Sequence, residues 1–152
     1  MKQFTMTLSK RLQRPVVKLE NFFNIYAMID TGALFPVWNY KEEILTMIGG
    51  VKIASNAGFR GFGGKTFGNI YRIPNFRVGD LIFPQFHIVA NRDNLPCHML
   101  LSATVFNNLI YEIDNFHHKL NVTIPDSESV SRNLVITDSN GILHVACTSS
   151  EF

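Results

Sequence analysis

Cysteine, charge and long apolar runs are all scarce in this sequence. Its 152 residues include only two cysteines, Cys97 and Cys147, which have no CxxC spacing and therefore predict reduced structural thiols rather than a disulfide or zinc framework. Charged residues make up 17% of the chain and the net charge is only +2, with Lys and Arg scattered. Without a basic block to neutralise a run of phosphates, we expect no nucleic-acid partner.

No apolar stretch approaches the roughly 20 residues that a membrane-spanning helix needs, so we expect no membrane partner. The N-terminal residues are interrupted by polar side chains and lack the apolar core of a secretory signal, which favours a cytoplasmic protein. Hydrophobic residues nevertheless make up 46% of the chain, enough for one compact folded domain.

Short segments with period-two alternation dominate the sequence and indicate an all-β architecture with one short helix. We expect strands at residues 3–8, 16–20 and 22–30, a short helical segment near 40–50, and a hairpin over 51–73 with a glycine-rich tip at 55–68. Further strands are expected at 81–90, 111–114 and 119–124, with a helix at 102–109. A hairpin at 133–147, turning at 138–141, ends the chain. We divide the chain into a main domain, 1–125, and a C-terminal hairpin extension, 126–152, packed on it.

The segment MIDTGA contains the residues most suggestive of chemistry. An apolar strand ends in the carboxylate of Asp30, the hydroxyl of Thr31 and Gly32, followed by the small residue Ala33. Asp, Thr and Gly are common turn formers, so the triplet alone indicates an ordinary turn more often than a catalytic site. Its sequence context decides between the two.

In that context the chain resembles the retropepsin-like aspartic peptidases over roughly residues 4–124. The corresponding parts are IYAMIDTGALFPVW, the glycine-rich GFRGFGGKTFGNIYRIP, the apolar DLIFPQFHIVA, MLLSATVFNNL, and the hairpin YEIDNFHHKLNVTI. The resemblance implies a closed barrel with acid-protease topology and a homodimer. It also implies that each subunit supplies one Asp30 carboxylate, with Thr31 and Gly32 shaping the loop.

The same resemblance implies an aspartic endopeptidase that acts on polypeptide substrates. One carboxylate would act as general base on a water while its protonated partner donates to the substrate carbonyl, as in the well-known aspartic-protease dyad. Because one carboxyl must hold a proton, cleavage should favour mildly acidic conditions. Ala33 and a flap tip at Gly61, Phe62, Gly63 and Gly64 would bind substrate, with Ile29, Leu34 and Ile53 as further candidate pocket linings. Neither a metal nor an organic cofactor is required.

Several alternatives remain open from the sequence. The family has a glycine after the apolar pair that enters the helix, whereas this chain has Ser102 after Leu100 and Leu101, so a catalytically silent peptide-binding or dimerisation module is the main alternative. An unrelated small β-barrel with an accidental Asp-Thr-Gly is weaker. The glycine-rich segment lacks the spacing of a phosphate-binding loop, and Asp138 to Gly141 is interpreted as a hairpin turn.

The remaining polar and aromatic residues suggest packing rather than chemistry. His117 and His118 lie in a polar turn, and His87 and His98 are interpreted as packing or surface residues. Phe35, Trp38 and Tyr40 are expected in the core or in a dimer contact. For that contact, residues 3–8 and the hairpin 132–148 are the candidate strands.

Overall fold

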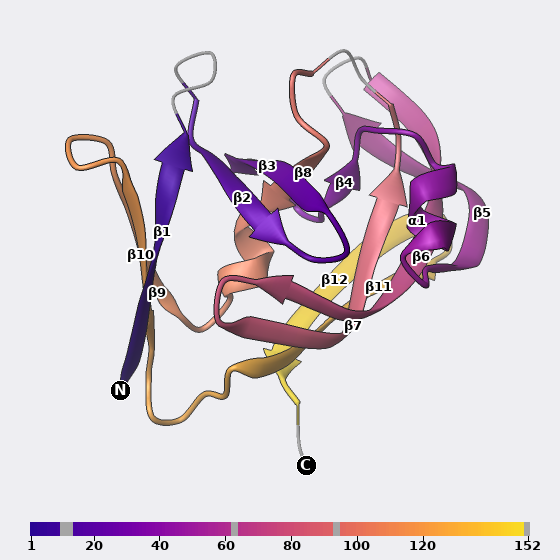
Figure 1. Cartoon of the computed structure of the whole chain (residues 1–152). Coiled ribbons are helices and arrows are strands. Elements are labelled where there is room, and N and C mark those ends of the chain that lie inside the picture. Colours follow the sequence, from indigo (N-terminus) through magenta and orange to yellow (C-terminus); the bar gives the residue numbers. More distant parts are fainter. Residues whose placement is uncertain (10–13, 62–63, 93–94, 151–152) are drawn as a thin grey trace.

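A computed structural model describes residues 1–9, 14–61, 64–92 and 95–150 of the chain. Most of them are in strands, as the alternation predicted (Figure 1). The elements in chain order are β1 (Lys2–Ser9), β2 (Val16–Glu20), β3 (Asn24–Asp30), β4 (Val37–Trp38), α1 (Glu43–Met47), β5 (Val51–Gly61), β6 (Gly64–Val78), β7 (Leu81–Ala90), β8 (Met99–Ser102), η2 (Ala103–Phe106), β9 (Ile110–Asp114), β10 (Lys119–Ile124), β11 (Ser131–Ser139) and β12 (Ile142–Ser149).

The strands form one continuous path in the order β12-β11-β7-β4-β8-β3-β2-β1-β10-β9, with the β5–β6 hairpin joined to it through β7. In Figure 1, β1, β9 and β10 lie together at the left, and β5 and β6 lie at the right. Among the described residues the two ends of the path, β12 and β9, do not pair with each other. The expected closed barrel is therefore wrong, and the sheet is open.

The core contains the large apolar side chains expected from the strand pattern. Phe76 and Phe86 stack with ring centroids 4.3 Å apart, and Phe83 meets Phe86 edge to face at 5.2 Å. Trp38 is completely buried and Phe35 nearly so, which confirms the core interpretation for both. β3 is apolar on both faces because Ala27 and Ile29 face the main core while Met28 packs in a second cluster with Val16 and Cys97.

Two predicted local structures differ from the observed ones. The glycine-rich segment 55–68 is mostly strand, because β5 and β6 stay paired from Ala57–Gly68 up to Gly61–Gly64. The expected helix at 102–109 is a single 3-10 turn, η2, of four residues. It stops early because Asn107 is already extended and Asn108 adopts a positive φ of 64°, which ends helical propagation.

The C-terminal hairpin joins the sheet. β11 pairs in parallel with β7 on one side and antiparallel with β12 on the other. Its turn has positive φ at Asn140 and Gly141, and the Asp138 side chain accepts the Gly141 N–H at 3.0 Å. Asp138 thus belongs to a tight hairpin turn, as predicted.

β1 is not a free edge. It pairs with β10 over Lys2–Thr7 and with β2 over Leu8–Ser9, so residues 3–8 already have a strand partner. Within the part of the chain that the structure describes, β9 and β12 have a strand partner on one side only. No described helix is long and apolar enough to span a membrane.

Candidate active site

Two consecutive strands, β3 and β4, and a third from much later in the sequence, β8, hold the Asp30 loop. β3 runs parallel to β8 and β4 runs antiparallel to it, so β8 lies between two strands that the Asp30 loop connects. Asp30 pairs with Ser102, and Val37 pairs with Leu100. The loop must therefore cross over the end of β8, which fixes its two ends and turns its centre outward.

Within the loop, short-range hydrogen bonds shape the turn. The Gly32 N–H donates to Asp30 Oδ1 at 3.0 Å, and the Ala33 N–H donates to the Asp30 carbonyl at 3.2 Å. The first bond fixes one carboxylate oxygen and leaves Oδ2 as the other acceptor. Asp30 and Ala33 are half-buried, whereas Thr31 and Gly32 are exposed and Leu34 is 69% exposed. The predicted catalytic residues and Ala33 thus occupy one surface-facing turn.

Ser102 is completely buried behind this turn. The retropepsin-like peptidases, which the sequence resembles, have a glycine at the corresponding position. Its hydroxyl lies 2.6 Å from Thr104 Oγ1, and Thr104 Oγ1 lies 2.9 Å from the Leu34 carbonyl. A carbonyl can only accept, so the Thr104 proton goes to Leu34 and the Ser102 hydroxyl donates to Thr104. The added side chain therefore has a partner and links η2 to the Asp30 loop. Ser102 precedes η2 but makes no side-chain capping bond.

The predicted flap is the β5–β6 hairpin. Gly61 and Gly64 are its last described pair, and Phe62 and Gly63 lie outside the described residues. The Phe59 ring of β5 meets Phe35 edge to face at 5.2 Å. This contact joins the hairpin to the Asp30 loop near its β4 end.

The other candidate pocket residues are divided between core and surface. Ile29 is 5% exposed and belongs to the core. Ile53 is 40% exposed on β5. The sequence already indicated that Ile29 and Asp30 point to different sides of β3, since neighbouring residues of a strand face opposite sides.

The histidines lie apart from this site. His98 packs against Trp38 and Tyr26, and His117 Nδ1 lies 2.7 Å from Asp114 Oδ2. His87 is buried on β7 and accepts the Ile136 N–H at 2.9 Å. In the described ranges, no three His, Cys, Asp or Glu side chains gather as metal ligands would.

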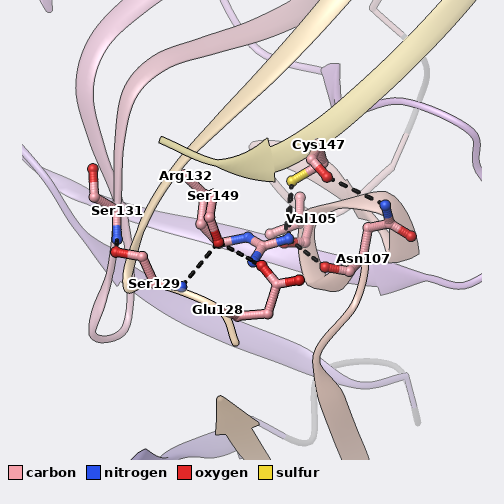
Figure 2. A network of polar contacts seen from close by, with 8 residues as sticks. All are labelled: Val105, Asn107, Glu128, Ser129, Ser131, Arg132, Cys147 and Ser149. Atoms are coloured by element: carbon pink, nitrogen blue, oxygen red, sulfur yellow. Dashed lines mark hydrogen bonds and ion pairs between the residues drawn. The ribbon is translucent and has the colours of Figure 1, made fainter. Parts of the chain in front are cut away.

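A buried polar network on the far side of η2 was missed from the sequence. Arg132 of β11 is fully buried and donates to the Asn107 carbonyl at the end of η2, and its Nη1 lies 3.5 Å from Glu128 Oε2 (Figure 2). The sequence predicted only a C-terminal hairpin extension here. A signal was available, because Arg132, Leu134 and Ile136 are spaced two apart on a strand and therefore share its buried face.

The comparisons with known proteins agree with the geometry at the level of fold. No protein-family model matches the chain, and no curated protein matches it. Among solved structures, a retropepsin-like aspartic protease from Rickettsia conorii superposes with a TM-score of 0.58 and 15% sequence identity, covering 80% of this chain and 89% of that one. At this identity the likeness shows the fold alone: the chain has a β-rich fold similar to that of a retropepsin-like aspartic protease.

Proposed function

We propose that the protein is an aspartic endopeptidase whose active form is a homodimer with one Asp30 from each subunit in a shared site. The observation that carries the proposal is the position of Asp30, at the end of a buried strand, on a turn that crosses β8 and faces the surface. The fold likeness to a retropepsin-like aspartic protease supports it.

The chemistry needs two carboxyl groups and one water. An ionised carboxylate takes a proton from the water while the protonated partner donates to the substrate carbonyl, which gives a tetrahedral intermediate. Proton transfer to the leaving nitrogen then breaks the C–N bond. The Gly32 N–H on Asp30 Oδ1 would hold the carboxylate in a fixed orientation during these transfers.

A second copy is required because the dyad needs two aspartates and the chain has one Asp-Thr-Gly. The exposure of Thr31, Gly32 and Leu34 supports a two-fold contact at this turn, since it leaves the turn accessible to its own copy. The open β9 and β12 edges are further surfaces that such a contact could use. The substrate would be an extended polypeptide bound between the turn and the β5–β6 hairpin.

The test compares the parent protein with Asp30→Asn on a peptide library from pH 4 to pH 8, with the mass of each measured by sedimentation. We expect the parent to cleave, with higher rates at the acidic end, and Asp30→Asn to lose activity by at least about 10³-fold while dimerising normally. Equal cleavage by both proteins would refute the proposal.

The alternative is a silent module of the same fold. It predicts a dimer that binds peptides without cleaving them, whatever the pH. Cleavage separates the two, and a statine-type inhibitor supports the assignment if it raises the melting temperature of the dimer more than an ordinary peptide of matched sequence does at the same concentration; a silent module should respond equally to both.

A further inference from the structure

Outside the Asp30 turn, η2 and the residue that follows it make polar contacts with the C-terminal hairpin. η2 has four residues, too few to be stable by its own hydrogen bonds. Its position must therefore be set by what it touches at each end. One end contacts the Asp30 loop through Thr104 and the other contacts β11 and β12 (Figure 2).

The hairpin holds the C-terminal end of η2 through three contacts, and a fourth joins Arg132 to Cys147 within the hairpin. Arg132 Nη2 donates to the Asn107 carbonyl and lies 3.6 Å from Cys147 Sγ. The Asn107 side chain donates to the Cys147 carbonyl at 3.2 Å, and Cys147 Sγ contacts the Val105 carbonyl at 3.7 Å. Two backbone carbonyls of η2 and its flank are thus fixed by side chains of β11 and β12.

Arg132 is an unusual choice if its only role is stability. Its guanidinium is buried, its Nε and Nη1 have no hydrogen bond to any described residue, and its nearest carboxylate, Glu128, approaches only to 3.5 Å. Removing such a charge from water costs about as much as the ion pair regains, so replacing Arg132 and Glu128 together by apolar residues of similar size would be comparably stabilising. What the guanidinium adds is a defined direction for each donor.

At the other end of η2, Thr104 donates to the Leu34 carbonyl and accepts from Ser102. Leu34 lies four residues after Asp30, in the same turn. A displacement of η2 would therefore move the Leu34 backbone, and with it the turn that orients the Asp30 carboxylate. The contacts run without a gap from Arg132 through Asn107 and η2 to that turn.

We propose that Arg132 is a positioning residue for the candidate catalytic turn, and that the C-terminal hairpin acts on Asp30 through η2. The inference deepens the proposed peptidase function and rests on it for its kinetic readout. It makes the hairpin part of the working site rather than a covering for a sheet edge.

The test is a double-mutant cycle between the two ends of η2. Arg132→Met removes the directed donors at similar volume, and Thr104→Val removes the hydroxyl that reaches Leu34. We expect each variant to lower kcat on the order of tenfold to a hundredfold with KM changed less than about threefold, because a small misplacement of a reacting group costs that much. The double variant should be little worse than either single one, since both release the same turn.

Two controls separate positioning from folding. Ile136→Ala, on the same buried face of β11, should destabilise the protein in urea without lowering kcat of the folded fraction. Thr104→Ser keeps the hydroxyl and should retain parental kcat. The inference would be overturned if the fold-loss of kcat in the double variant equalled the product of the two single losses. It would also be overturned if Ile136→Ala lost as much kcat as Arg132→Met.

A second readout does not need activity. Amide hydrogen exchange of Gly32 and Ala33, whose N–H groups bond to Asp30, should accelerate in Arg132→Met but not in Ile136→Ala, with both compared at equal global stability. If the parent protein cleaves nothing, the proposed function fails, and the exchange result alone decides whether Arg132 positions the turn. Unchanged exchange in Arg132→Met would refute the inference even in an active enzyme.

Discussion

Asp30 and Ser102 lie opposite each other on the parallel strands β3 and β8, and the hydroxyl of Ser102 is completely buried behind the Asp30 turn. The Ser102 side chain has a hydrogen-bond partner here, because its hydroxyl donates to Thr104 Oγ1 and the Thr104 hydroxyl donates to the Leu34 carbonyl. Two hydroxyls in series thus link β8 and η2 to the Asp30 turn.

Ser102 should stabilise the protein without being needed for chemistry. Ser102→Ala removes one buried hydrogen bond and should lower the free energy of unfolding by about 1 kcal/mol. Ser102→Gly should lower it by roughly a further 0.5–1 kcal/mol, because glycine has more freedom in the unfolded chain. Urea denaturation measures both, and peptide cleavage by the two variants should stay within a few-fold of the parent. A large loss of activity in Ser102→Ala alone would contradict this assignment.

Gly68 is required by the close approach of β6 to β7. A Cβ at this position would lie 2.5 Å from the Ala90 carbonyl oxygen and 2.8 Å from Val89 Cγ1. Gly68→Ala should therefore cost about 1–3 kcal/mol of stability, measured by urea denaturation.

Gly141 offers a contrasting control for Gly68→Ala. A Cβ there meets nothing within 4 Å, but φ is +78°, which asparagine tolerates better than most residues. Gly141→Asn should change stability by less than about 0.5 kcal/mol on the same assay. Equal losses at the two glycines would show that crowding at β7 is not the cause.

His87 should make the fold less stable in acid. Burial lowers the pKa of His87 below its ordinary value of 6.5, and its Nδ1 already accepts the Ile136 N–H. The folded pKa is below the unfolded one, so the unfolded state binds the extra proton and stability falls as pH drops below about 6.5. In His87→Gln the urea concentration at the unfolding midpoint should change less between pH 7.5 and pH 5 than it does in the parent protein. A parental slope in this variant would assign the acid sensitivity to other groups.

Tyr71 should titrate later than ordinary tyrosines. Burial, together with the hydrogen bond from its hydroxyl to Glu42 Oε2 at 2.7 Å, raises the pKa of Tyr71 to about 12. Because the folded pKa is raised, the tyrosinate is disfavoured in the fold and stability is lost between about pH 10 and pH 12. Absorbance at high pH should show this late phase, and Tyr71→Phe should remove it. Glu42→Gln should shift it toward lower pH.

Local patterns predicted the strands well because each carries its own alternation. β2, β7, β10 and the β11–β12 hairpin lie where the sequence placed them. The open sheet could not be read in the same way, because closure depends on which distant strands pair. The length of η2 was missed for a related reason: its apolar residues fit a helix, but its extent is decided by Asn107, Asn108 and the contacts with the hairpin.

The candidate site was predictable only in part. Asp30, Thr31 and Gly32 stand out because an apolar strand ends in polar and small residues. The role of Thr104 was not visible, since its partner Leu34 lies 70 positions away in the chain. Arg132 did not stand out because its neighbours are serine and asparagine, although its spacing from Leu134 and Ile136 marks the buried face of a strand.

The insertion of β8 between β3 and β4 also has a consequence for synthesis on the ribosome. The Asp30 turn emerges early, but the strand it crosses and the residues that brace it follow only after position 98, and Arg132 later still. In a nascent chain the local hydrogen bonds of Gly32 and Ala33 to Asp30 can form early, but the contacts of the turn with β8 and Thr104 can form only after these later segments have been made.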